Sequence, residues 1–164
     1  MSRLHKDLED AFIDLMHKNE RIIYKVCSFY VSEQSPMEDL YQEVVLNLWK
    51  SYPKFRNESQ ISTWIYRVAL NTCITDLRQN LKFKSHIPLP PSFEIPFESE
   101  NMESELKELY SLIYRLNKVE RSLILLWLEE KSYQEISDIT GLNVSNVGVK
   151  LKRAKEKLIK MSNQ

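Results

Sequence analysis

The sequence predicts an all-α protein of two small helical domains joined by a proline-rich linker. Apolar residues recur at helical spacing over long segments, alternating β-branched runs are almost absent, and only two glycines occur in 164 residues. Four of the six prolines, by contrast, fall within nine residues, between positions 88 and 96. Such a segment is typical of an extended connection between domains. The predicted boundaries are 1–81 for the first domain, 82–103 for the linker and 104–164 for the second domain.

The composition is that of an ordinary folded protein, with 43% hydrophobic and 28% charged residues. Cys27 and Cys73 are isolated, with neither C-x-x-C spacing nor a nearby histidine cluster, so we expect buried thiols and no disulfide, metal site or cofactor. No run approaches the roughly 18 apolar residues of a membrane span, and the N-terminus (MSRLHKDLED) is unlike a signal peptide. We therefore expect a cytoplasmic protein with no direct membrane insertion.

Three helices are predicted in the first domain. The first carries a continuous apolar face with a candidate break at Asn19. The second has a well-marked start, because Ser35 can cap it, Pro36 suits the first helical position and Glu38 can close a capping box. The third carries a core stripe that includes Trp64 and Ile65. The expected bounds are about 7–31, 36–50 and 60–81.

The second domain is predicted to open with two helices before its most informative segment. The first of them covers about 102–116, and Asn117 is placed to cap the second. Apolar spacing assigns eight side chains to the core of these two helices: Leu106, Leu109, Leu112, Ile113, Val119, Leu123, Ile124 and Trp127.

Residues 132–160 (SYQEISDITGLNVSNVGVKLKRAKEKLIK) indicate two helices joined by a tight turn. Ser132 and Glu135 have the S-x-x-E spacing of a capping box, which starts the first helix. Gly141 supplies a left-handed residue at its end, and Asn143 can cap the second helix. This short helix, turn and helix is the arrangement that places a probe in the major groove of DNA.

The second of these helices is expected to be amphipathic and basic. Val144, Val147 and Leu151 predict an apolar stripe that faces the first helix. Six basic residues against one acid between 150 and 160 suit contact with phosphates. The alternative is a helical hairpin with a solvated lysine face. The residues expected to face outward are Ser145, Asn146, Val149, Lys150, Lys152 and Arg153.

A second basic region lies in the first domain, although the net charge of the whole chain is zero. Residues 50–84 carry seven basic and two acidic side chains, as a channel for a nucleic-acid strand requires. Thr63, Arg67, Asn71 and Arg78 fall on one face of the predicted third helix, away from its core stripe.

Several motifs in order resemble the sigma-70 family, in particular its small extracytoplasmic-function (ECF) members. In the first domain they are residues 36–49 (PMEDLYQEVVLNLW), 55–59 (FRNES), 62–69 (STWIYRVA), Asn71 and 76–78 (DLR). In the second domain they are residues 132–136 (SYQEI) and 141–142 (GL), within a similarity that covers 116–158. The resemblance therefore spans nearly the whole chain.

The resemblance implies a promoter-recognition subunit of bacterial RNA polymerase that catalyses no covalent chemistry. The first domain would correspond to region 2 of the family, which binds core RNA polymerase, captures a flipped base of the −10 element and helps to melt the DNA; the second would correspond to region 4, which reads the −35 element. The implied partners are core RNA polymerase, promoter DNA and, from family habit, an anti-sigma factor.

The implied polymerase-binding residues are Asp39, Gln42, Glu43 and Asn47. Those for the −10 element are Phe55, Arg56, Ser59, Arg67, Asn71 and Arg78. Those for the −35 element are Ser145, Asn146, Lys150, Lys152 and Arg153.

The sequence departs from the family pattern at four positions. Gly148 and Val149 stand where many members have a basic residue and a serine, and a mid-helix glycine costs about 1 kcal/mol relative to alanine. Close approach of the backbone to DNA and a shifted set of contacts both remain open as explanations. Asn57 and Ile61 stand where glycine and phenylalanine are frequent, so the base pocket is expected to differ in shape.

Alternatives remain for the site and for the function. The face with Asp39 and Glu43 is equally explained by solvation, and Trp64 by core packing alone. The main rival function is a stand-alone helix-turn-helix regulator whose N-terminal helices dimerise or sense a ligand. A helical adaptor or enzyme is the least favoured, because no catalytic or metal-ligand spacing appears and the three histidines (His5, His17 and His86) are isolated.

Overall fold

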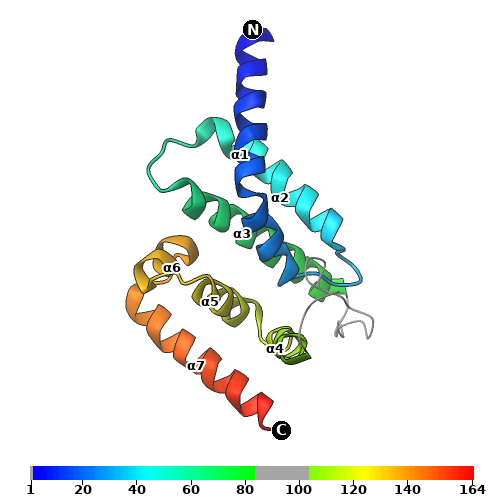
Figure 1. Ribbon diagram of the computed structural model, residues 1–164, viewed down its shortest axis with the longest axis vertical. Coiled ribbons are helices and arrows are strands. Elements are labelled where there is room, and N and C mark those ends of the chain that lie inside the picture. The colour runs from blue at the N-terminus through cyan, green and yellow to red at the C-terminus, as the bar shows by residue number, and fades with distance from the viewer. Residues whose placement is uncertain (1, 84–103) are drawn as a thin grey trace.

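The computed structural model describes residues 2–83 and 104–164, and these two ranges contain helices and no strand (Figure 1). The all-α prediction is therefore confirmed. Residues 84–103, which make up most of the predicted linker and include His86, lie outside the described residues. The elements are α1 (Ser2–Ser28), α2 (Met37–Ser51), the 3-10 turn η1 (Tyr52–Lys54), α3 (Ile61–Phe83), α4 (Ser104–Ile113), α5 (Lys118–Leu128), α6 (Tyr133–Thr140) and α7 (Val144–Ser162).

The N-terminal half is a bundle of α1, α2 and α3. The first two helices run antiparallel, because Phe12 in the first half of α1 packs on Trp49 near the end of α2, while Tyr24 near the end of α1 packs on Tyr41 near the start of α2. The beginning of α1 projects beyond the bundle (Figure 1). The candidate break at Asn19 is wrong: the Asn19 amide donates to the Leu15 carbonyl at 2.9 Å within an uninterrupted helix. The helix starts earlier than predicted and ends earlier, at residue 28.

The predicted capping box at the start of α2 is also wrong. Pro36 occupies the N-cap position, no side chain caps the helix, and its first residue is Met37. The Ser35 hydroxyl instead donates to the carboxylate of Asp76 on α3. A hydrogen bond to a carboxylate is stronger than one to a backbone amide, so Ser35 bonds to Asp76 on α3 and does not cap α2.

The C-terminal half is a bundle of α4 to α7 whose helix starts agree with the local signals. Asn117 and Ser132 each accept a hydrogen bond from the backbone amide three residues on, in complete capping boxes. Gly141 ends α6 with a left-handed φ of 79°, and the Asn143 side chain caps α7. The capped starts of α6 and α7 and the glycine that ends α6 are therefore as predicted.

Four residues assigned to the core are exposed instead: Leu106, Val119, Trp127 and Val144. In α5 the buried residues are six in a row, 121–126, because α3, α6 and α7 all contact this helix and bury more than one stripe. Trp127 stays at the surface, where the Lys155 ammonium lies 4.1 Å from its ring centroid. In α7 the buried stripe is shifted by one turn, to Val147, Leu151, Ala154 and Leu158.

The two halves lie against each other. Their buried apolar side chains form one continuous cluster, in which the rings of Phe29 and Tyr110 meet with centroids 5.4 Å apart. Helix α3 lies beside α5 and α6 (Figure 1). The two predicted helical domains therefore pack against each other in this arrangement, because apolar and polar groups near the end of α1 have partners on α4 and α5. None of the helices in 2–83 or 104–164 is long and apolar enough to cross a bilayer.

Candidate nucleic-acid and protein interfaces

One face of α2 carries three of the four residues implied in polymerase binding. Asp39, Gln42 and Glu43 are exposed on successive turns of the face opposite the buried Leu40, Val44 and Leu48. Asn47 lies between the two faces and is partly buried, because its amide donates to the Thr72 hydroxyl at 2.9 Å. The Asn47 side chain therefore joins α2 to α3 by a hydrogen bond and does not face solvent.

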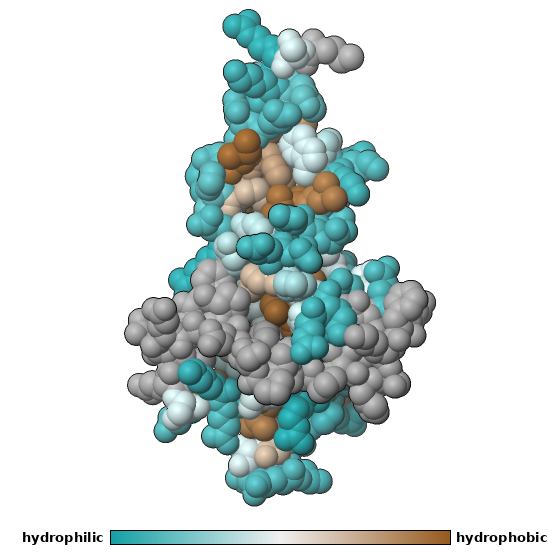
Figure 2. All heavy atoms as spheres, turned by 90° about the vertical axis from the view of Figure 1, so that its right-hand side faces the viewer, coloured by the Kyte–Doolittle hydropathy of each residue, from teal (hydrophilic) through white to brown (hydrophobic). Residues whose placement is uncertain are grey.

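Sequence reasoning missed Leu46, which lies on the same face as Asp39, Gln42 and Glu43. It is 44% exposed, a large value for a leucine in a bundle with a full core. On the side of the molecule seen in Figure 2, apolar side chains form small patches among polar ones, mainly over the upper part, where α1 and α2 lie. The spacing of 39, 42, 43 and 46 was the available signal, since it places all four on one face.

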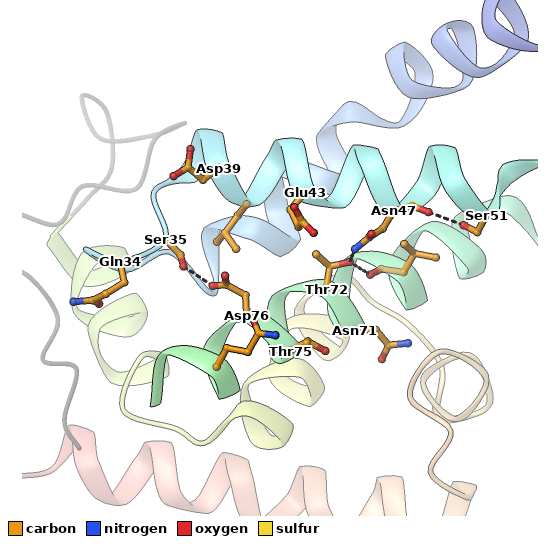
Figure 3. Close-up of a pocket in the computed structure, with 13 residues that line it drawn as sticks. Gln34, Ser35, Asp39, Glu43, Asn47, Ser51, Asn71, Thr72, Thr75 and Asp76 are labelled. Atoms are coloured by element: carbon orange, nitrogen blue, oxygen red, sulfur yellow. Dashed lines mark hydrogen bonds between the residues drawn. The ribbon is translucent and has the colours of Figure 1, made fainter. Parts of the chain in front are cut away.

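A cavity of about 680 Å³ lies between α2 and α3 (Figure 3). Asp39 and Glu43 line it from α2, and Asp76 and Asn71 from α3. Among the described residues its lining has three carboxylates and no basic side chain. This cavity therefore disfavours phosphate and suits a cationic group.

A second cavity, of about 400 Å³, lies at the loop before α3 and brings together four of the six residues implied in −10 binding. These are Phe55, Arg56, Ser59 and Arg67; Lys54, Glu58, Ser51 and Trp64 complete the lining. Phe55 stacks on Trp64 with ring centroids 4.8 Å apart and an interplanar angle of 30°. Trp64 is 8% exposed, so it packs in the core and also forms a wall of the cavity.

The backbone of this loop explains one departure from the family pattern. Asn57 has a left-handed φ of 58°. Asparagine is among the few residues with a side chain that adopt this conformation readily, so it can take the place of glycine there.

The other two residues implied in −10 binding lie along α3. Arg67, Asn71 and Arg78 are all exposed and share one face of that helix. Asn71 lines the acidic cavity between α2 and α3 rather than the basic one. Four of the six residues implied in −10 binding therefore line the basic cavity, and the other two lie further along the same helix.

The outward face of α7 carries all five residues implied in −35 binding, and each is exposed. Gly148 lies on the side of α7 that faces α6. The ring of Tyr133 from α6 lies against it, with Cε2 3.4 Å from the position that a Cβ would take. This is an ordinary contact distance, so packing within the chain does not by itself require a glycine at this position.

Polar contacts join the basic face of α3 to the first helix of the helix-turn-helix. The Arg67 guanidinium donates to the Asp138 carbonyl of α6. Glu129 accepts from the Tyr66 hydroxyl at 3.2 Å and pairs with Lys25 at 3.4 Å. Burial first, and then the adjacent Glu129 carboxylate, raise the pKa of Tyr66. Tyr66 therefore remains a neutral hydrogen-bond donor in this contact.

Arg121 of α5 is the most buried charged group of the described chain, at 7% exposure, and sequence reasoning did not single it out. It donates to the Phe29 carbonyl at 2.9 Å, which belongs to the N-terminal half, and to the carbonyls of Tyr114 and Leu116 at 3.0 and 3.1 Å. Burial lowers its pKa, while the neighbouring Tyr30 and Tyr114 act in the opposite direction.

Comparison with known protein families gives two matches. The family described as Sigma-70 region 2 matches residues 15–82, and the family described as Sigma-70, region 4 matches residues 106–158. Together these segments cover most of the chain, in the same order as the two helical halves.

Individual relatives match along most of their length. The RNA polymerase sigma factor SigV of Bacillus subtilis is 29% identical over 144 residues, which are 84% of this chain and 81% of the relative. The ECF RNA polymerase sigma-E factor of Escherichia coli is 27% identical over 176 residues, covering 95% of this chain and 88% of the relative.

Solved structures show the same fold. The sigma factor RpoE in complex with the anti-sigma factor NepR, from Bartonella quintana, superposes with a TM-score of 0.77 at 15% identity, covering 93% of this chain and 97% of that one. CnrH in complex with the cytosolic domain of CnrY gives a TM-score of 0.66 at 20% identity, covering 94% and 89%.

Proposed function

The chain belongs to the sigma-70 family of RNA polymerase sigma factors, in its extracytoplasmic-function group, and on this premise we propose how its two halves divide promoter recognition. The N-terminal half binds core RNA polymerase and the −10 element, and the C-terminal half binds the −35 element. The chain helps to melt the duplex and catalyses no covalent reaction itself. It acts in the cytoplasm, where the polymerase and the promoter are.

The observation that carries the proposal is the basic cavity at the loop before α3. Phe55, Arg56, Ser59 and Arg67 line it together although 12 positions separate the first from the last. Extruding a base from a duplex costs a few kcal/mol, which stacking and hydrogen bonds in a pocket must offset. Phe55 and Trp64 offer aromatic surface for stacking, Ser59 offers a hydroxyl to a base edge, and the two arginines attract phosphates.

Asn71 and Arg78 extend this surface along α3. Arg78 would contact the strand that leads away from the cavity, and the Asn71 amide would donate to and accept from the edge of a base. The acidic cavity beside Asn71 would direct phosphates toward the arginines of this face, because Asp39, Glu43 and Asp76 repel them.

The exposed face of α2 would bind core polymerase. Asp39, Gln42 and Glu43 offer acceptors and an amide to a basic protein partner, and Leu46 adds an apolar contact in the middle of this polar patch. Interfaces are commonly organised in this way, with an apolar centre and a polar rim. Asn47 would act indirectly, by holding α2 against α3.

Promoter binding would require the two halves to separate. In the arrangement described, Arg67 is bonded to α6, so part of the −10 surface lies against the helix-turn-helix. Core polymerase, by binding the halves at distant points, would hold them apart. The anti-sigma factor NepR in the complex of RpoE supports an anti-sigma factor as a further partner of this chain. Such a partner would favour the arrangement in which the two halves pack together.

Co-purification with core RNA polymerase, followed by run-off transcription on genomic fragments, tests the proposal. We expect a stable complex and new start sites that depend on this chain. Sequence-specific DNA binding by the isolated chain, without association with core polymerase, would instead support the rival assignment as a stand-alone helix-turn-helix regulator. An Arg56→Ala variant should retain the complex and lose the start sites, which separates polymerase binding from recognition of DNA.

A further inference from the structure

Val149 lies at the centre of the outward face of α7. Successive residues of an α-helix are rotated by about 100°, so position 149 falls opposite the middle of the buried stripe formed by Val147, Leu151, Ala154 and Leu158. Its side chain is 46% exposed. An isolated apolar residue therefore occupies the most outward point of a face that is otherwise polar and basic.

The two sequence neighbours of Val149 differ, because Lys150 on one side carries an exposed basic side chain and Gly148 on the other carries none. Gly148 has no side chain, and the Tyr133 ring lies against its backbone. Ser145 precedes Val149 by one turn, and Lys152 and Arg153 follow by one turn, on the same face. Polar side chains therefore surround position 149, whose own side chain can make only apolar contacts.

Major-groove chemistry limits what a valine can recognise. In a helix-turn-helix the N-terminal part of the second helix meets the base edges, and position 149 is in the second turn of α7. The thymine C5-methyl is the apolar group on these edges. Against guanine or cytosine, valine would desolvate donors and acceptors without replacing their hydrogen bonds.

From this geometry we propose that Val149 is a specificity-determining residue that contacts the C5-methyl group of a thymine in the −35 element. The inference rests on the proposed function and assigns a base preference to that site. The β-branched side chain supports it, because a restricted χ1 angle presents the two methyl groups in a fixed direction at little entropic cost. Lys152 and Arg153 would hold adjacent phosphates and set the register.

Replacing thymine by deoxyuridine, which removes only the methyl group, tests the proposal. The complex of the chain with core polymerase first selects duplexes from a library in which the −35 segment is randomised. Each thymine of the selected sequence is then replaced in turn. We expect one position at which deoxyuridine weakens binding about three- to fivefold, the effect of burying one methyl group. In Val149→Ala this effect should disappear, while the effects at other positions stay unchanged.

Val144→Ala is the matched control, since Val144 is a similarly exposed valine of the same helix, at 41%, but lies away from the centre of the outward face. This variant should keep the full deoxyuridine effect. If no thymine responds to loss of its methyl, or if Val149→Ala responds as the wild type does, the proposal is wrong and Val149 is an ordinary surface valine, while the proposed function stands. If the complex selects no −35 sequence at all, the proposed function fails and the inference with it.

Discussion

Replacing Arg121 by methionine should destabilise the folded chain substantially. The guanidinium donates to three carbonyl groups, one from the end of α1 and two from the turn between α4 and α5. It also lies 5.3 and 5.2 Å from the ring centroids of Tyr30 and Tyr114. Methionine has a similar length and no donor, so Arg121→Met removes the hydrogen bonds while filling most of the volume.

The size of the effect follows from the carbonyl groups left without a donor. Each buried carbonyl that loses its partner costs about 1–3 kcal/mol. Opposing this loss, the variant no longer has to bury a charge, a penalty that is visible in the lowered pKa of Arg121. For three carbonyl groups we expect a net loss of about 3 kcal/mol in the free energy of unfolding, or about 6–12 °C in Tm for a chain of this size.

Urea denaturation followed by circular dichroism and tryptophan fluorescence measures this difference. Arg115→Met is the matched control, because Arg115 is exposed at the end of the same turn and its replacement should change stability by no more than about 0.5 kcal/mol. A loss below about 1 kcal/mol for Arg121→Met would refute the reasoning. It would mean that the cost of burying the guanidinium cancels the hydrogen bonds that it makes.

Three further substitutions have distinct expected outcomes. Gly148→Ala should raise the stability of α7 by about 0.5–1 kcal/mol in thermal melts, because a Cβ would meet Tyr133 at an ordinary contact distance of 3.4 Å; a loss of stability would show that the ring cannot adjust. Asn71→Ala should reduce initiation at a cognate promoter at least about tenfold in run-off assays and leave the affinity for core polymerase unchanged; an equal loss of both would contradict its role in base capture. Leu46→Glu should weaken binding to core polymerase at least about tenfold in a competition assay, whereas Ile13→Glu, at a similarly exposed position of α1, should not. Equal effects of the two variants would exclude the exposed face of α2 as the specific contact.

The candidate sites were predictable to different degrees. The outward residues of α7 followed from helical periodicity alone, and all five are exposed. For the −10 surface the residue types and a shared helical face could be predicted, but not the division between a basic cavity with Arg67 and an acidic one with Asn71. Leu46 was missed because only polar side chains of this helix were considered as contacts, although its spacing from Asp39, Gln42 and Glu43 already placed it on their face.

Local sequence determined where α5, α6 and α7 begin and where α6 ends. The capping boxes at Asn117 and Ser132 and the left-handed Gly141 involve atoms within about four residues of each other, so no distant partner is needed to form them. The same is true of the buried stripe of α7 to within one turn.

Only the tertiary structure decided which polar groups pair across the chain. Ser35 donates to Asp76, 41 positions away, and does not cap the helix that follows it. Arg121 donates to the Phe29 carbonyl, 92 positions away. The close packing of the two halves has the same origin, since buried donors and acceptors must be satisfied by whichever partners the packing brings near. Sequence spacing cannot identify those partners, because their separation along the chain bears no relation to their distance in the fold.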